Sequence, residues 1–180
     1  MTEQGGYSGV HKIAGVPQRF IANASVGGRV MCADNQPVRT KEKLADFDGV
    51  SLYPSSMARI PGYLLGPPKV WHKGVDVRKV DGYFLKIKVH SVGRKFRFPL
   101  VRLKEEGGGN LWTNDLEGQE VIVDRFTLED LVNHGKVKYS ILQGYYFDEG
   151  RNDRVNEVIK TMFNTRLRYK KEGNPLQLVI

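Results

Sequence analysis

Hydrophobic and polar positions alternate along residues 83–92, the clearest local pattern in the chain. The apolar positions are Leu85, Ile87 and Val89, and the basic positions between them are Lys86, Lys88 and His90. A period of two is typical of a β-strand with one buried and one solvent-facing side. The pattern therefore predicts a strand whose outer face is basic.

Weaker patterns predict further elements on both sides of this strand. Strands are expected at residues 29–33, 44–47, 120–123 and 137–147, and helices at 51–60, 127–135 and 152–172. Residues 127–130 resemble a capping box that opens the second helix, and Gly173 ends the third. Asn174 and Pro175 then suit the N-cap and first residue of another helix. Together these elements predict an α+β fold.

Composition excludes several classes of protein. The 180 residues are 40% apolar and 10% aromatic, as in a globular domain with a core. The single cysteine, Cys32, excludes an intrachain disulfide and a Cys-based zinc site. No apolar run reaches the roughly 18 residues of a membrane span, and residues 1–9 lack the pattern of a secretory signal. We therefore expect an intracellular protein that is not secreted and has no membrane partner.

The charge balance favours a polyanionic partner. Lys and Arg number 28 against 20 Asp and Glu, which gives a net charge of +8. Such a surplus suits nucleic acid as a partner. Besides the basic strand face, the candidates for phosphate contacts are Arg94, Lys95, Arg97, Arg102 and Lys104. Ordinary solvated charge explains each of them singly at least as well.

The most specific pattern is Asp-Gly-Val-Ser-Leu-Tyr-Pro-Ser at residues 48–55. An aspartate ends a predicted strand, and Ser-Leu-Tyr-Pro follows at a short fixed distance. Phosphoryl transfer uses divalent metals to neutralise a triphosphate and to activate the attacking hydroxyl. Magnesium prefers oxygen ligands, so a carboxylate at a strand end suits it. The alternative is a simple strand-to-helix turn with Asp48 as the N-cap.

These residues resemble motif A of family B DNA polymerases. The resemblance implies that Asp48 is the catalytic metal ligand for Mg²⁺ and that the Gly49 carbonyl is a second ligand. Asp46 lies two residues earlier, but the distance from Asp48 to Ser51 fits the family better. The second carboxylate of a two-metal site would come from motif C, a Tyr-x-Asp-Thr-Asp hairpin that is not found in this sequence.

The resemblance also implies a nucleotide site. The backbone amides of Ser51 and Leu52 would bind the triphosphate, and Tyr53 would pack under the sugar and exclude a 2′-hydroxyl. Residues 166–177 resemble the fingers segment just before motif B, where basic residues hold the triphosphate. The candidates there are Arg166, Arg168 and Lys170. A solvated basic helix face is the alternative for this segment.

Residues 25–30 resemble the Tyr-x-Gly-Gly element that precedes motif A in the same enzymes. Gly27 and Gly28 would let template phosphates approach the backbone, with Ser25 and Arg29 as neighbouring DNA-binding residues. Ser25 stands where the family usually has tyrosine, so this sequence departs from the family pattern at that position. A hairpin turn is the alternative for this segment.

Roughly 110 residues separate the motif A and fingers segments. Protein-primed family members of phages, linear plasmids and organelles carry an insertion there, which contacts the terminal protein and the duplex. The implied parts are a flexible segment 1–20, a palm part 21–66, a β-rich insertion 67–150 and the start of the fingers 151–180. The palm is expected to hold a mixed sheet with helices. The short apolar helix at the C-terminus suggests a truncated chain.

The resulting hypothesis is template-directed DNA synthesis by part of a protein-primed family B DNA polymerase. The implied partners are primed DNA template, deoxynucleoside triphosphates, a terminal protein primer and the remaining polymerase half. An infected host's cytoplasm or an organelle is the implied location. The isolated chain is expected to be inactive, because motif C is missing. The alternative is a non-catalytic DNA-binding module, or one half of a split polymerase.

Overall fold

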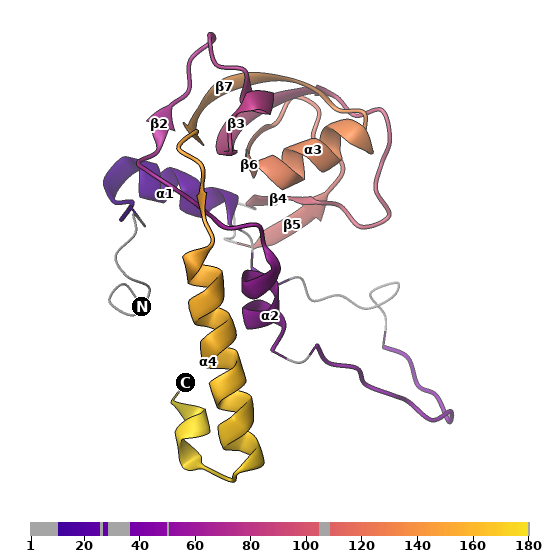
Figure 1. Ribbon diagram of the computed structural model, residues 1–180. Helices are drawn as coiled ribbons and strands as arrows, with labels where there is room; N and C mark the ends of the chain where they lie inside the picture. The colour runs from indigo at the N-terminus through magenta and orange to yellow at the C-terminus, as the bar shows by residue number, and fades with distance from the viewer. Residues whose placement is uncertain (1–10, 26, 29–36, 50, 105–108, 180) are drawn as a thin grey trace. The chain divides into compact units, whose positions relative to one another are not determined.

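The computed structural model describes residues 11–25, 27–28, 37–49, 51–104 and 109–179 (Figure 1). The chain divides into two compact units. Unit 1 consists of Met1–Ser8, Gly27–Tyr63 and Asn152–Ile180, and unit 2 consists of Gly9–Val26 and Leu64–Arg151. Strands and helices occur together, so the predicted α+β class is confirmed.

Unit 2 is built on a four-stranded sheet with the order β2-β7-β3-β6. Its strands are β2 (Lys69–Val70), β7 (Lys138–Phe147), β3 (Gly82–Ser91) and β6 (Glu120–Asp124). The pairings in this sheet are antiparallel, as is the pairing of β4 (Val101–Lys104) with β5 (Asn110–Thr113). These antiparallel strands lie within residues 67–150, the stretch expected to be a β-rich insertion, so the mixed sheet expected for the palm part at 21–66 stays a prediction. A third, two-stranded sheet joins β1 (Tyr63–Leu64) and β8 (Arg151–Asn152).

The core of unit 2 lies on one face of β3. Leu85, Ile87 and Val89 are fully buried, at 0% exposure, and β6 and β7 flank them. Leu128 and Leu131 of α3 (Arg125–Asn133) belong to the same buried cluster. The intervening basic positions of β3 are half-buried or exposed. The prediction of a strand with one buried and one basic face is therefore confirmed.

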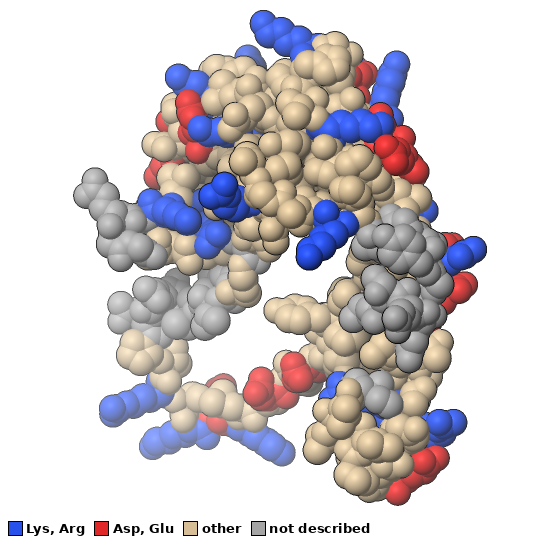
Figure 2. Space-filling model, turned by 90° about the vertical axis from the view of Figure 1, so that its left-hand side faces the viewer, with Lys and Arg blue, Asp and Glu red and all other residues tan. Residues whose placement is uncertain are grey.

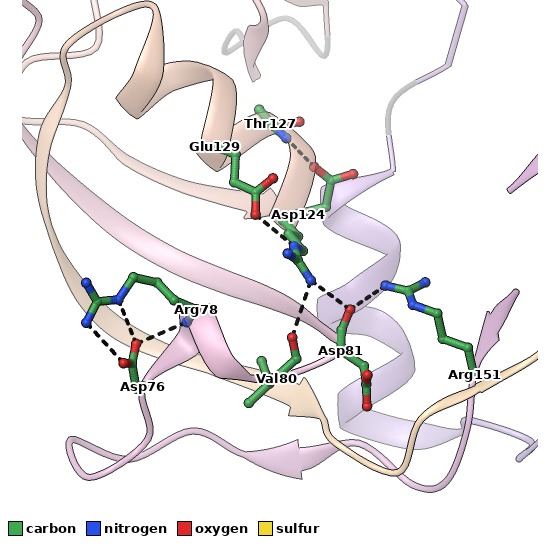
Figure 3. A network of polar contacts seen from close by, with 9 residues as sticks. Asp76, Arg78, Val80, Asp81, Asp124, Thr127, Glu129 and Arg151 are labelled. Atoms are coloured by element: carbon green, nitrogen blue, oxygen red, sulfur yellow. Dashed lines mark hydrogen bonds and ion pairs between the residues drawn. The ribbon is translucent and has the colours of Figure 1, made fainter. Parts of the chain in front are cut away.

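Helix α3 begins at a different residue from the one predicted. Asp124 is its N-cap, and the Asp124 carboxylate accepts a hydrogen bond of 2.8 Å from the Thr127 backbone N–H (Figure 3). The capping box predicted at residues 127–130 is therefore wrong, because Thr127 already lies in the first turn of the helix. Asp and Thr are both common N-cap residues. Strand β6 ends at Asp124, so the helix begins directly after that residue.

An arginine network fastens α3 to the start of β3. The Arg125 guanidinium donates to the Glu129 carboxylate at 2.8 Å and to the carbonyls of Val80 and Asp81 at 3.3 and 3.2 Å. Arg151 donates to the same Asp81 carbonyl (Figure 3). Two arginines from different elements, Arg125 and Arg151, therefore donate to the turn that precedes β3.

A second arginine contact holds the loop before this turn. Asp76 caps the 3-10 helix η2 (Val77–Lys79) by accepting from the Arg78 backbone N–H at 3.1 Å. The Arg78 guanidinium also donates to both Asp76 carboxylate oxygens, at 2.9 and 3.0 Å (Figure 3). These bonds to the charged form lower the pKa of Asp76 to about 2.

The segment expected to be flexible contains a helix, α1 (Gly15–Ala24). Residues 1–10 of that segment lie outside the described residues. In the helix, half-buried positions recur at helical spacing at Pro17, Phe20, Ile21 and Ala24. The Phe20 ring packs edge-on against Tyr145 of β7, with ring centroids 5.3 Å apart. This long-range contact and the spacing explain why a Gly-rich, polar-looking segment folds.

The predicted strand at 44–47 is absent. Leu44 and Phe47 are 80% and 91% exposed, and no described strand pairs with this segment. Three apolar residues around Asp46 suggest burial, but a strand also needs a neighbour for its backbone groups. The strand expected at 29–33 lies outside the described residues. The strands expected at 120–123 and 137–147 are confirmed as β6 and β7.

The described part of unit 1 contains two α-helices and a short 3-10 helix. They are α2 (Leu52–Arg59), α4 (Arg154–Lys171) and η3 (Pro175–Leu178). Figure 1 shows α2 beside the first half of α4, and the two helices are in contact. Gly173, with φ +67°, ends α4 as predicted, and the Asn174 side chain caps η3 through the Leu176 N–H at 3.0 Å. The final helix is therefore 3-10 rather than α-helical.

Candidate active site

The predicted metal ligands lie just before helix α2 in unit 1. Asp48 and Gly49 end an exposed segment without regular secondary structure. Among the described residues, the Asp48 carboxylate makes no ion pair and accepts no hydrogen bond, so its oxygens face solvent. At Gly49 an added Cβ would meet only the Leu52 side chain, at an ordinary 3.5 Å. Protein packing therefore leaves both positions open to a ligand.

The predicted nucleotide residues form the beginning of α2. Ser51 is the N-cap in the left-handed region, with φ 47° and ψ 51°, and its side chain makes no capping bond. Its carbonyl accepts the first helical bond, from the Ser55 N–H at 2.9 Å. The first N–H groups of a helix have no partner within the helix, so they can bind an anion. Leu52 and Tyr53, in the first turn, are 57% and 73% exposed.

Sequence proximity and one turn of helix thus bring together Asp48, Gly49 and residues 51–53. Pro54 follows within the first turn of α2, where its missing N–H costs no helical bond. The predicted helix at 51–60 is confirmed. The roles assigned to these residues stay predictions.

The predicted triphosphate-binding cations lie on the later turns of α4. Arg166, Arg168 and Lys170 are exposed. Arg168 lies 3.9 Å from the Glu172 carboxylate, and its guanidinium stacks 5.4 Å from the Tyr169 ring centroid. Cations in the last turn also interact favourably with the helix dipole, so part of this charge serves the helix itself.

A residue that sequence analysis missed connects α2 to α4. Asn156, in the first turn of α4, is only 4% exposed. Its amide nitrogen donates to the Met57 and Ile60 carbonyls, at 3.0 and 2.7 Å. An asparagine among charged residues gives no sequence signal for this role. Only the pairing of two helices far apart in the sequence reveals it.

The predicted template-binding residues follow helix α1. Ser25 is the C-cap of α1, and its carbonyl accepts a hydrogen bond from Arg102 of β4 at 3.4 Å. Gly27 and Gly28 are exposed, and an added Cβ would meet nothing within 4 Å at either. The fold therefore does not require these glycines for packing. Arg29 lies outside the described residues.

Several predicted basic contacts already have partners within unit 2. Lys86 pairs with Glu120 at 2.6 Å, and this bond lowers the pKa of Glu120. Lys95 pairs with Asp115 at 2.7 Å. Lys88 is exposed and makes no ion pair within the described part of the chain. On the face drawn in Figure 2, Lys and Arg side chains are scattered, with wide areas of other residues between them.

The described residues hold no cluster of three or more His, Cys, Asp or Glu side chains that could bind a metal ion. Among the described residues, the carboxylates nearest in sequence to the start of α2 are Asp48 and Asp46, and backbone carbonyls lie beside them. Such a set fits Mg²⁺, which commonly uses one or two carboxylates and completes its shell with water and substrate phosphates. It does not fit a closed metal site made by the protein alone. Over the described residues, no helix has the length and apolarity needed to cross a membrane.

Comparison with known families identifies the chain. The sequence model of the family described as DNA polymerase type B, organellar and viral, matches residues 10–180. The chain therefore belongs to this family of DNA polymerases. No curated protein and no solved structure matches it. The resemblance seen at residues 48–55 is confirmed at the level of the family, while the motif boundaries stay predictions.

Proposed function

We propose that this chain supplies the motif A part of a protein-primed DNA polymerase that transfers deoxynucleotides onto a primer hydroxyl. The observation that carries the proposal is the order of Asp48, the left-handed Ser51 and the start of α2, in a chain of this family. That order presents a carboxylate and free helix amides next to each other. These are the two groups that a metal-bound triphosphate requires.

In this proposal Asp48 and the Gly49 carbonyl hold Mg²⁺. The ion, when bound, neutralises triphosphate charge and activates the primer hydroxyl. Ser51 and Leu52 orient the phosphates through their backbone N–H groups. The exposed Tyr53 ring packs under the sugar, where a 2′-hydroxyl would clash with it. Specificity for deoxynucleotides then comes from shape rather than from an added bond.

The remaining roles extend over both units. Arg166, Arg168 and Lys170 supply positive charge for the triphosphate, and Ser25, Gly27, Gly28 and Arg29 contact the template strand. Residues 21–66 act as palm, 67–150 as the insertion that contacts a terminal protein, and 151–180 as the start of the fingers. Residues 1–20 precede the palm, and α1 now occupies part of that stretch. The setting is an infected host cell or an organelle.

The isolated chain is expected not to polymerise DNA. A two-metal site needs a second carboxylate close to the first, and no Tyr-x-Asp-Thr-Asp segment occurs in the sequence. A second polypeptide with motifs B and C would supply it. Primer extension by the pure 180-residue chain would contradict this part of the proposal.

A complementation assay tests the proposal. The chain is mixed with a separately expressed piece that carries motifs B and C, primed DNA, deoxynucleotides and Mg²⁺. We expect incorporation that Asp48→Asn lowers by about a hundredfold or more, as loss of an essential metal ligand should. Asp46→Asn is the matched control, because it removes the same charge two residues earlier. Equal losses in both variants would show that local charge, not metal binding at Asp48, is responsible.

The alternative is a non-catalytic DNA-binding module, which the net charge of +8 favours. It predicts binding to primed DNA without incorporation, even when a folded complex with the second piece forms. It also predicts that Asp48→Asn leaves DNA binding unchanged or slightly tighter. The same assay therefore separates the two functions.

A further inference from the structure

The end of helix α2 depends on a side chain from another helix. The last four carbonyls of a helix have no partner within it. Here the Asn156 amide of α4 serves the carbonyls of Met57 and Ile60, at 3.0 and 2.7 Å. Asn156 is almost fully buried, so water competes little for these bonds.

The chemistry of the two bonds fixes the orientation of the amide. Carbonyl oxygens only accept hydrogen bonds, so the group between them is the NH₂ end of Asn156. The Asn156 side-chain oxygen is then buried, and it has no partner among the described residues. Asn156 also lines a pocket of about 330 Å³, together with residues 58–61 of the α2 end and Asp153, Glu157 and Lys160 of the α4 start. An unpaired buried oxygen opposes stability, so stability alone is a poor explanation for this residue.

The two hydrogen bonds at the end of α2 also affect the position of the proposed nucleotide-binding residues at its start. Helix α2 has eight residues and is about 12 Å long, which is short enough to move as a rigid rod. Ser51, Leu52 and Tyr53 are at its other end. Fixing the Met57 and Ile60 carbonyls to α4 therefore also fixes where the free amides and the tyrosine ring lie. Arg166 of α4 is about 15 Å along that helix from Asn156.

We propose that Asn156 is a positioning residue for nucleotide selection, which holds α2 in register with α4. This inference rests on the proposed function of Ser51, Leu52 and Tyr53. Asn156 contacts no substrate in it. Its two hydrogen bonds fix the position of the Tyr53 ring relative to the α4 cations. They thereby fix the space between the Tyr53 ring and the sugar, which a 2′-hydroxyl would have to occupy.

The test is sugar discrimination in the complementation assay. Asn156→Ala deletes the amide donor to both carbonyls and leaves the Met57 carbonyl with the longer bond of 3.5 Å from the Tyr63 hydroxyl. Asn156→Asp places a carboxylate against the two carbonyls. We expect both variants to lower the ratio of kcat/KM for deoxynucleotides to that for ribonucleotides by about tenfold, since small displacements can cost up to about a hundredfold. KM for the deoxynucleotide should also rise. A smaller folded fraction lowers both rates equally and leaves the ratio unchanged.

Two control variants separate position from stability. Asn164→Asp makes the same chemical change at an exposed site on α4, and Ile159→Ala weakens the packing of α4 without touching the α2 carbonyls. Both should keep the wild-type ratio, although Ile159→Ala should lower Tm. A wild-type ratio in both Asn156 variants, an equal fall in Ile159→Ala, or loss of folding in both Asn156 variants would overturn the inference. No incorporation by the wild-type pair would contradict the proposed function instead.

Discussion

At the scale of single residues, Gly144 lies where no side chain fits. It pairs with Leu85 across β3 and β7, and an added Cβ would lie 2.5 Å from the Phe84 carbonyl oxygen and 2.6 Å from a Leu85 methyl carbon. The strands would have to move apart at the centre of the sheet. We expect Gly144→Ala to lower the free energy of unfolding by about 1–3 kcal/mol, measured by urea denaturation of the chain.

Gly28→Ala is the matched control for this substitution. An added Cβ at Gly28 meets nothing within 4 Å, so the free energy of unfolding should stay within about 0.5 kcal/mol of the wild type. If Gly28 approaches template phosphates as proposed, the same variant should weaken binding to primed DNA. Similar stability losses in both variants would mean that the crowding at Gly144 is relieved by a small shift of the strands.

At the scale of elements, the N-cap of α3 can be tested directly. The Asp124 carboxylate satisfies the Thr127 N–H, which otherwise has no partner within the helix. We expect Asp124→Ala to lower the free energy of unfolding by about 1 kcal/mol. Asp130→Ala removes the same charge from an exposed position of the same helix and should cost less than about 0.5 kcal/mol. Thermal unfolding of both variants gives the comparison, and equal losses would argue against the cap.

Elements with a strong local period could be predicted from the sequence. Strand β3 alternates cleanly, and α4 has apolar residues at helical spacing and a glycine at its end. Helix α1 was missed because its apolar positions are few and become useful only when Phe20 meets Tyr145. A strand at residues 44–47 was predicted wrongly, because a few apolar residues do not show whether a neighbouring strand exists.

The candidate site also has one part that could be predicted from the sequence and one part that could not. Residues 48–53 are recognisable because they are consecutive, and one turn of helix keeps them together. The contact of Asn156 with Met57 and Ile60 joins residues that are distant in the sequence, and nothing in the residue type announces it. The consecutive site residues were therefore predictable from the sequence. The contact that joins their helix to α4 could be found only in the three-dimensional structure.

At the scale of the whole molecule, the count of 28 Lys and Arg residues overstates the number of cations available to DNA. Lys86 and Lys95 already form ion pairs with Glu120 and Asp115, at 2.6 and 2.7 Å. A lysine that is paired within the protein releases few counterions when DNA binds. The exposed Lys88, on the outer face of β3, makes no such ion pair among the described residues, although it lies opposite Glu120, so it should contribute more than Lys86 or Lys95.

The salt dependence of DNA binding measures this difference. For primed duplex DNA, the slope of log Kobs against log salt concentration should become shallower by about one in Lys88→Ala. The double variant Lys86→Ala, Glu120→Ala keeps the net charge and should leave the slope unchanged. Lys73→Ala removes one exposed charge away from the strand face, and it should also keep the wild-type slope. If Lys73→Ala changes the slope as much as Lys88→Ala, net charge rather than the basic face of β3 governs DNA binding.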